Sequence, residues 1–429
     1  MNSTETKTSS NAHNVNTFLY WKDKNLISDK TYRELSIAAK LPSLKQLQDR
    51  SKDLNSLFTI KPLTNKQGVY EPLQHKLVRI LTHNFSNLNN CDLTIKLTGD
   101  GTRIGKRLHI ITAGFVLINN HFKSPDYVLS MAKGQESYTT IRDITFDIIN
   151  STHSLKKLTV GVKDYSLKYV LCADLKFLNL IMGLGGFKSD YCCLWCFAPT
   201  KEFRLFDKQF KKRTVEEISR LSENKKSHFN CLHKPIFPFI AVKDVIPDPL
   251  HMFLRISDQL IRQLIKLLRE KDKIEKKTKN IVKSNCKSIM QFEIFVQNLG
   301  YDWHFYTCPE TALMKYPDFQ GPQHEKIQKH INLIDFLGDH PKFELINSLW
   351  KRFPQLIADL KHISEEHEIL KFKADSKQWL EDWRRAYPSK DITVYMHVMC
   401  SHGGDAIRRH GSLSKFSQQG FEKLNDTFN

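Results

Sequence analysis

Two pairs of metal-binding residue types, placed far apart along the chain, constrain its fold more than any other sequence feature. Cys193 and Cys196 flank a Leu-Trp dipeptide, whereas His397 and His402 lie near the end of the sequence. A Cys-x-x-Cys turn directs two thiolates toward one point, and structural zinc takes four Cys or His ligands in a tetrahedron. If the four side chains bind one zinc ion, the C-terminal segment must fold back onto the middle of the chain.

This shared zinc site competes with a simpler interpretation, in which the cysteines are core thiols and the histidines are surface residues. A Cys-x-x-Cys pair arises easily by chance, and the His spacing differs from the i, i+4 pair of a regular helix. Convergence of His397 and His402 therefore calls for a helix end or a kink. We favour the zinc site, and we expect the spare candidates Cys192 and Cys400 to be packing residues.

The charge balance favours a polyanionic partner. Lys and Arg (65) exceed Asp and Glu (46), which gives a net charge of +19 and favours nucleic acid over an acidic substrate. The nine cysteines form no regular framework, and the chain starts with polar residues rather than a signal peptide. Both features favour reduced thiols and an intracellular protein. No stretch reaches the roughly 20 apolar residues of a membrane span, so we expect no membrane partner.

The N-terminal part is predicted to be helical after a short tail. Residues 1–15 are poor in apolar side chains and are predicted to form a disordered tail. Residues 16–90 show apolar residues three and four apart, with Ser28 as a helix N-cap, and are predicted to form an N-terminal helical region. A packing subdomain is favoured there over an accessory DNA-binding piece.

Residues 91–200 change to the pattern of strands. Leu93, Ile95 and Leu97 alternate with polar residues, and the Asp100-Gly101 turn precedes a second apolar run, so a β-hairpin is expected. A further strand is expected over residues 141–149. The buried run 169–173 ends on Asp174, immediately before a helix, which is where α/β sheets place catalytic carboxylates.

The remainder is predicted to be mostly helical. Residues 201–385 contain one more predicted strand at 237–243 and then several helical patterns, the first of them capped by Asp248. Residues 386–429 hold the His pair and a short helix that carries Glu422. We therefore expect an α/β core interrupted by a large helical insertion.

Three carboxylates complete the candidate site. A zinc ion shared by the Cys and His pairs would bring Glu422 beside Asp174, and Asp100 on the first strand would join them. Clustered carboxylates repel one another unless divalent cations neutralise them, and two such ions serve phosphodiester chemistry. This is the arrangement of a ribonuclease H-like core, a mixed sheet with flanking helices. The simpler alternative for Asp100 is turn chemistry, because Gly-Asp-Gly is common in turns.

The order of these residues resembles the catalytic core of Transib transposases and of the related recombinase that rearranges antigen-receptor genes. The segment from Asp248 to His251 also looks like a [C/D]xxH motif found in many cut-and-paste transposases. Three longer segments, around Asp174, Cys193 and Glu422, are similar to an uncharacterised family of transposon-derived proteins. That similarity covers most of the chain from about residue 27 onward.

The resemblance implies a DDE-type DNA transposase located in the nucleus. Asp100, Asp174 and Glu422 would hold two Mg²⁺ or Mn²⁺ ions, and the zinc ion would be structural. The partners would be double-stranded DNA at transposon ends and at the target, and the chain would form a homodimer. Asp248 and His251 would be structural or DNA-positioning residues. Basic residues that would contact DNA phosphates are Arg103, Lys106, Arg107, Lys176, Arg408 and Arg409, although solvated surface charge is the simpler interpretation of any one of them.

Two other functions stay open at this point. A domesticated descendant would keep the zinc-stabilised fold and the basic surface but no longer cut DNA. This alternative fits the absence of a recognisable zinc finger or helix-turn-helix, and the end of the chain soon after Glu422 fits a shortened copy. The other open function is that of a basic zinc-stabilised interaction module unrelated to transposases, in which the three acids would be scattered in space.

The net charge of +19 predicts sequence-tolerant DNA binding that weakens steeply with salt. Phosphate contacts release condensed counterions, so six or more of them lower affinity about a thousandfold between about 50 and 200 mM salt. Fluorescence anisotropy with a labelled duplex measures this slope. An affinity that stays flat over that range would argue against a nucleic-acid role.

Overall fold

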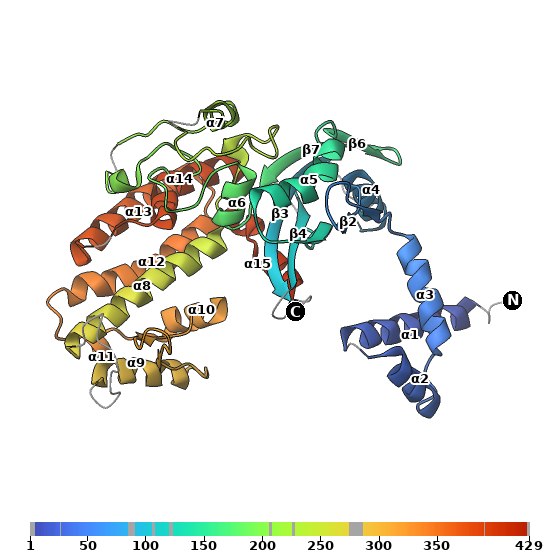
Figure 1. The fold of residues 1–429 in the computed structure, drawn as a ribbon, viewed down its shortest axis with the longest axis horizontal. Coiled ribbons are helices and arrows are strands. Elements are labelled where there is room, and N and C mark those ends of the chain that lie inside the picture. Colours follow the sequence, from blue (N-terminus) through green and yellow to red (C-terminus); the bar gives the residue numbers. More distant parts are fainter. Residues whose placement is uncertain are drawn as a thin grey trace.

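The computed structural model describes residues 5–25, 27–84, 91–104, 108–119, 123–205, 208–224, 228–273, 286–389 and 391–426. Figure 1 shows a central sheet, with a set of long helices on one side of it and three N-terminal helices at the opposite end of the molecule. The fold is therefore mixed α/β, as the sequence predicts at that coarse level.

The three N-terminal helices form a small core of their own. They are α1 (Glu5–Lys24), α2 (Asp29–Ala38) and α3 (Leu44–Ser56). Ser28 caps α2 by accepting a hydrogen bond from Thr31 N, and four buried side chains hold the group together, namely Leu19, Tyr32, Leu44 and Leu47. Helix α1 begins at Glu5, inside the segment that composition predicts to be disordered; residues 1–4 of that segment lie outside the described part.

A seven-stranded mixed sheet forms the centre of the molecule. Its strands are β1 (Lys61–Pro62), β2 (Gly68–Tyr70), β3 (Asp92–Ile104), β4 (Leu108–Ile118), β5 (Tyr127–Lys133), β6 (Lys157–Val160) and β7 (Lys163–Leu171). They are ordered β1-β2-β5-β4-β3-β7-β6, and only the β3–β7 pair is parallel. The parallel pair makes β7 end beside the middle of β3, where Leu97 faces Leu171.

Helices cover both faces of this sheet. They are α4 (Leu73–Asn84), α5 (Tyr138–Thr152), α6 (Leu175–Ile181) and the C-terminal α15 (Gln419–Asp426). Gly99 on β3 lies against the ring of Phe177 from α6, whereas Gly114 on β4 lies against Phe421 from α15. Gly114 is paired with Thr98, so these two residues share one face of the sheet. Gly99 is the next residue after Thr98 and therefore faces the opposite side. Helices α6 and α15 therefore sit on opposite sides of the strands that carry the candidate site.

Three local predictions from the sequence are wrong. Asp100 and Gly101 do not form a turn, because β3 pairs with β4 without interruption as far as Ile104. Residues 141–149 lie in helix α5 rather than in a strand, with Ile141, Ile144 and Ile148 on its buried face. Residues 237–243 form no strand, and only Val245, just beyond them, makes a parallel bridge to Leu171.

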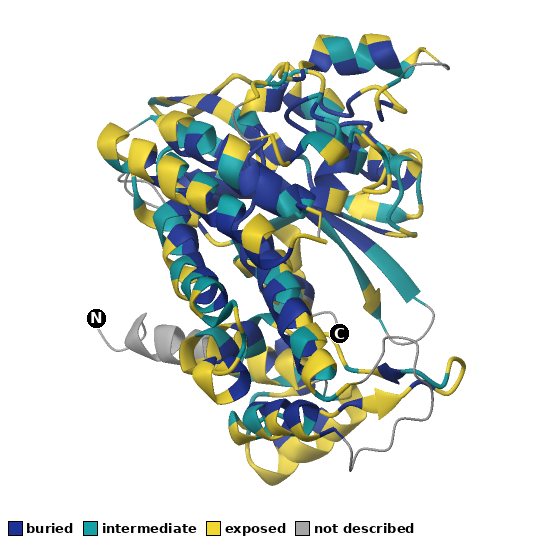
Figure 2. Cartoon of the chain, turned by 90° about the vertical axis from the view of Figure 1, so that its left-hand side faces the viewer, coloured by how far each residue is buried: buried dark blue, intermediate teal, exposed yellow. Residues whose placement is uncertain are grey.

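The long helices form one continuous hydrophobic core with the sheet. They are α8 (Pro249–Lys271), α9 (Lys287–Asn298), α10 (Gly321–His330), α12 (Phe343–His362), α13 (Glu366–Ala386) and α14 (Val394–His410). Smaller elements are α7 (Val215–Ser222), α11 (Ile334–Leu337), a hairpin of β8 (Tyr306–Thr307) with β9 (Met314–Lys315), and 3₁₀ turns at Thr200–Glu202, Val242–Asp244 and Leu413–Phe416. Figure 2 shows the buried faces of the long helices turned toward one another and toward the sheet. Among the described residues, no helix is long and apolar enough to cross a membrane.

Gly114 should be intolerant of a side chain because it sets the distance between β4 and α15. A Cβ there would lie 2.4 Å from the ring of Phe421 and 2.5 Å from the carbonyl oxygen of Tyr127. We expect Gly114→Ala to lower the free energy of unfolding by about 1–3 kcal/mol, as overpacking does in cores. Chemical denaturation measures this loss.

Gly186→Ala is the matched control for that experiment, because a Cβ at Gly186 meets nothing within 4 Å. It should leave the free energy of unfolding nearly unchanged. Equal effects of the two substitutions would show that α15 does not pack closely on β4.

Candidate functional site

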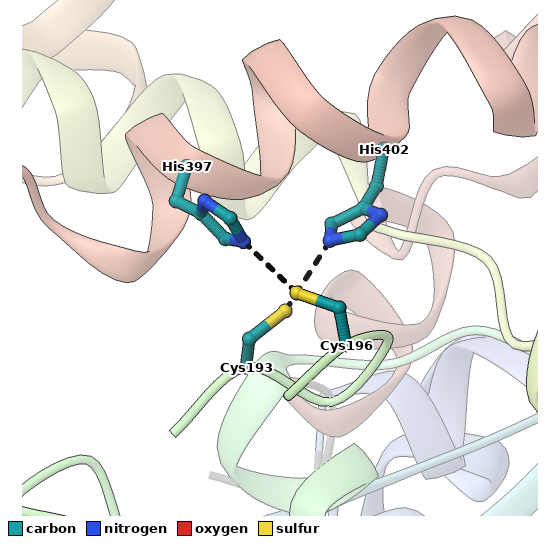
Figure 3. Close-up of side chains that lie close together, drawn as sticks. All are labelled: Cys193, Cys196, His397 and His402. Atoms are coloured by element: carbon teal, nitrogen blue, oxygen red, sulfur yellow. Dashed lines mark hydrogen bonds between the residues drawn. The ribbon is translucent and has the colours of Figure 1, made fainter. Parts of the chain in front are cut away.

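The Cys and His pairs meet at one point in the structure. Cys193 and Cys196 come from the irregular segment after α6, and His397 and His402 project from α14 (Figure 3). The four ligand atoms lie within 4.8 Å of one another, and each Sγ lies 3.4 Å from the Nε2 of one histidine. Ligand atoms around a tetrahedral zinc ion are about 3.6 Å apart, as its bond lengths require. This cluster can therefore bind a metal ion such as zinc.

Helix α14 presents both histidines without a break. His397 and His402 are five residues apart in a continuous helix that Thr393 caps, so the expected kink or helix end is not present. Phe203 stacks on the ring of His397 with the ring centroids 4.0 Å apart, and Trp195 packs against the ring of His402. These aromatic contacts fix the two imidazoles on either side of the Cys-x-x-Cys turn.

A buried arginine holds the Cys-x-x-Cys turn in shape. Arg213 donates from Nε to the carbonyl oxygens of Cys193 (2.9 Å) and Cys196 (3.1 Å), and its terminal nitrogens donate to the carbonyl oxygens of Tyr191 and Phe229. Its side chain is buried, so these carbonyls take the place of water around the guanidinium group. Arg213 also donates to the Sγ of Cys231. Sequence reasoning did not find Arg213, because its other hydrogen-bond partners are backbone carbonyl oxygens, which no side-chain pattern reveals.

The thiols of the cluster are polarised by their neighbours. Hydrogen bonds from Cys193, His397 and His402 lower the pKa of Cys196, while burial raises the pKa of Cys193. A thiolate beside imidazole nitrogens is the donor set of a zinc site, because the metal binds thiolates and neutral imidazoles. Cys192 and Cys400 lie outside the group of four, and burial raises the pKa of each to about 11.

The three predicted carboxylates lie in one electrostatically coupled group. Burial and the charges of Asp248, Asp100 and Asp174 raise the pKa of Glu422 to about 7, and burial and the charge of Asp174 raise the pKa of Asp100. Asp174 caps α6 by accepting a hydrogen bond from Phe177 N at 2.6 Å. Glu136, which sequence reasoning missed, borders the group, and burial and the charges of Asp174 and Asp100 raise its pKa.

One face of α15 fixes Glu422 over strand β3. Gln418 Nε2 donates to the carbonyl oxygen of Gly99 (3.0 Å), and Asn425 Nδ2 donates to Asp100 Oδ2 (2.9 Å). Glu422 stands between them, four residues after Gln418 and three before Asn425, so the three side chains share one helical face. Sequence reasoning missed Gln418 and Asn425, although this spacing is a signal that would have found them.

The Asp248-x-x-His251 segment at the start of α8 joins the same group. Asp248 accepts hydrogen bonds from the backbone N–H groups of His251 and Gln418, and its Oδ2 lies 2.6 Å from His251 Nδ1. His251 Nε2 lies 3.3 Å from Glu422 Oε1. Burial opposes the charge of His251, but the hydrogen bond and charge of Asp248 prevail and raise its pKa to about 9. His251 therefore links the cap of α8 to Glu422.

A lysine buried in the sheet anchors the segment before α15. Lys96 on β3 is fully buried, and its Nζ donates to the carbonyl oxygen of Ser417 at 3.1 Å. Cys172, at the end of β7, donates from Sγ to the carbonyl oxygen of Phe416. These hydrogen bonds pair the carbonyl oxygens of Phe416 and Ser417, which would otherwise be buried without a donor. Sequence reasoning also missed this role of Lys96.

The predicted DNA-contacting residues differ in their exposure and in their partners within the protein. Lys106 and Arg107 lie outside the described residues, and Arg103 is exposed on β3. Lys176 pairs with Glu136, and Arg408 pairs with Glu366. Arg409 donates to the carbonyl oxygen of Lys243. At least two residues of this set, Lys176 and Arg408, are therefore already paired with acids of the protein.

No protein-family model matches the chain, and no curated protein matches it significantly.

The Cys and His cluster predicts about one bound zinc ion per chain, whose removal lowers the melting temperature. Zinc bound only by the folded state adds its binding free energy to the stability. We therefore expect chelation, or the substitution Cys193→Ser, to lower the melting temperature by several degrees and to release the metal. Elemental analysis and thermal unfolding with and without chelator measure both effects.

Cys192→Ser provides the control, because Cys192 is the adjacent buried thiol outside the cluster. It should retain the zinc ion. Zinc loss from Cys192→Ser but not from Cys193→Ser would show that the ligands are assigned wrongly.

Proposed function

We propose that this chain is a DDE-type DNA transposase or recombinase with a ribonuclease H-like core, or a descendant of one. The observation that carries the proposal is the coupled group of Asp100, Asp174 and Glu422. These acids come from a strand, a helix N-terminus and a C-terminal helix, and the Cys and His cluster lies between the last two along the chain.

The strand order supports a ribonuclease H-like core. Three antiparallel strands, β3, β4 and β5, are followed by helix α5, by the short strand β6 and then by β7, which pairs in parallel with β3. The parallel bridge from Leu171 to Val245 extends the same edge. Asp100 lies on the central strand and Asp174 follows the end of its parallel neighbour. In the proposed core, these two acids would be the first two catalytic carboxylates.

The acids fit divalent cations. Buried carboxylates with raised pKa values are groups that gain from a nearby positive charge, and Asp100 and Glu422 both have this property. Asp100, Asp174 and Glu422 would hold Mg²⁺ or Mn²⁺, which would supply activation of the attacking oxygen and stabilisation of the leaving oxygen of a DNA phosphate. His251 and Asn425 would orient two of these carboxylates through the contacts described above.

The partners follow from the same proposal. Double-stranded DNA is the substrate, at transposon ends and at the target, and the net charge of +19 supports this choice. A nuclear location and a homodimer belong to the proposal as well, because they follow only from the resemblance to transposases.

A catalytically silent DNA-binding protein is the second candidate. The favouring observation is that protein donors already engage two of the acids: Asn425 donates to Asp100, and His251 lies within ion-pair distance of Glu422. Carboxylates that have such protein donors can stay buried in the fold without metal ions. The two candidates therefore differ in whether the acids serve cleavage or only the fold.

Cleavage should depend equally on all three acids. We expect the protein to cut duplex DNA carrying the terminal repeats that flank its gene, in the presence of Mg²⁺ or Mn²⁺. Asp174→Asn and Glu422→Gln should each lower the rate at least about a hundredfold, because they remove charge that holds the cation but keep the shape. Gel analysis of end-labelled duplex measures the rate.

Asp375→Asn is the control, since Asp375 is an exposed acid on α13. All variants should keep their zinc content and their salt-dependent DNA binding. A wild type that binds but never cuts would favour the silent descendant. Cleavage that survives Glu422→Gln would show that the third carboxylate is another residue.

A further inference from the structure

A cavity beside the zinc cluster combines aromatic walls with positive charge. Its volume is about 490 Å³, within the range of about 300–1,000 Å³ common for small-molecule sites. It lies between the irregular segment 237–247, the start of α7 and the second half of α14. Its lining includes Trp195, Phe239, Lys243, Arg409 and, at the zinc cluster, His402.

One of the two acids in the wall of this cavity, Asp405, is already neutralised by basic side chains. Asp405 accepts hydrogen bonds from Lys212 (2.7 Å) and Lys373 (2.8 Å), which lower its pKa to about 2 although burial opposes them. The carboxylate of Glu216 accepts a hydrogen bond from its own backbone N–H at the start of α7, which lowers its pKa. Glu216 keeps its negative charge, but the lining holds four basic residues against two acidic ones, so its net charge still favours an anion.

Two basic residues of the cavity wall, Lys243 and Arg409, have no acidic partner within the described part of the chain. Within the described part of the chain, no carboxylate lies within ion-pair distance of Lys243 Nζ or of the Arg409 guanidinium group. Both side chains are exposed to solvent. Two cations without an acidic partner, next to an apolar and aromatic wall, suit a ligand with both an anionic and a flat apolar part, since either part alone leaves half of the site unused.

The aromatic wall is rigid. The indole N–H of Trp195 donates to the carbonyl oxygen of Val245 at 2.8 Å, which fixes the ring plane. Phe239 packs edge-on against Phe237 and Tyr169. The ring of His402, which faces the metal cluster through Nε2, forms part of the same wall. Rings held in place in this way lose little entropy when a planar group stacks on them.

We propose that this cavity binds a nucleotide, with its base against Trp195 and Phe239 and its phosphate at Lys243 and Arg409. A nucleotide has the required planar apolar part and the required anion, and its size suits the cavity. The site is separate from the acidic group, and the proposal does not depend on DNA cleavage. The nucleotide is either free or the unpaired unit of a DNA strand, because both present the same chemistry.

Isothermal titration calorimetry of the full chain with deoxyadenosine monophosphate tests the proposal. We expect binding to be at least about tenfold tighter than that of deoxyadenosine or of inorganic phosphate, because each of those engages one half of the site. Lys243→Gln and Arg409→Gln should each weaken binding about tenfold. Phe239→Leu should weaken it by a similar factor, because the side chain stays apolar but loses its ring.

Lys371→Gln is the matched control, since Lys371 is an exposed lysine on α13, outside the cavity lining. It should bind as the wild type does. Zinc content and circular dichroism confirm that each variant is folded. No binding of deoxyadenosine monophosphate at millimolar concentration would overturn the proposal. Binding that survives all three cavity variants, or inorganic phosphate that binds as tightly as the nucleotide, would also overturn it.

A second titration distinguishes the two sources of the nucleotide. If a short single-stranded oligonucleotide displaces the monophosphate and loses affinity in the same variants, the site takes a strand. If the oligonucleotide binds equally to wild type and variants while the monophosphate does not, the site takes a free nucleotide. Both results support the cavity as a nucleotide site.

Discussion

The convergence of two thiols and two imidazoles is the interaction on which the rest of the structure depends. It joins the segment after α6 to helix α14, which otherwise belong to different parts of the chain. Helix α14 is followed within a few residues by α15, so whatever fixes α14 also fixes where Glu422 can lie. A metal ion held by four ligands can supply this constraint more strongly than apolar packing of the same few residues, because its binding energy adds directly to folding.

The constraint is completed by polar contacts rather than by a large apolar interface. Gln418 donates to Gly99 on β3, Lys96 donates to Ser417, and Asn425 donates to Asp100. Buried hydrogen bonds of this kind fix orientation well, because a shift of α15 along β3 would leave several donors unpaired at once. The close approach at Gly114 adds a steric limit, so α15 has one position on the sheet and the carboxylate of Glu422 has one direction.

The sequence reveals residues that act through their side chains more readily than those that act on backbone atoms. The Cys and His pairs could be predicted because metal binding restricts the residue types at each position. Arg213 was missed because it binds carbonyl groups, and any segment offers those. Asp100 was assigned to a turn because Gly-Asp-Gly favours turns, whereas pairing of β3 with β4 over its whole length overrides that preference. The helix over Ile141, Ile144 and Ile148 was missed for a different reason: its β-branched residues favour a strand, although their spacing is that of a helix.

The acidic group opposes the stability that the Cys and His cluster provides. The pKa of Glu422 is raised to about 7 by burial and by the charges of Asp248, Asp100 and Asp174, so the folded chain binds this proton more tightly than the unfolded chain does. Stability from this group is therefore present below the ordinary pKa of a glutamate and is lost as the pH rises toward 7. Asp100, whose pKa is also raised, acts in the same direction. A chain that keeps such a cost at neutral pH gains from any cation that binds there. Without a cation, the side chain of Asn425 donates to Asp100, and the backbone N–H of Gln418 donates to Asp248. His251, whose pKa is raised to about 9, contacts both Asp248 and Glu422, so its positive charge offsets part of the repulsion among the carboxylates.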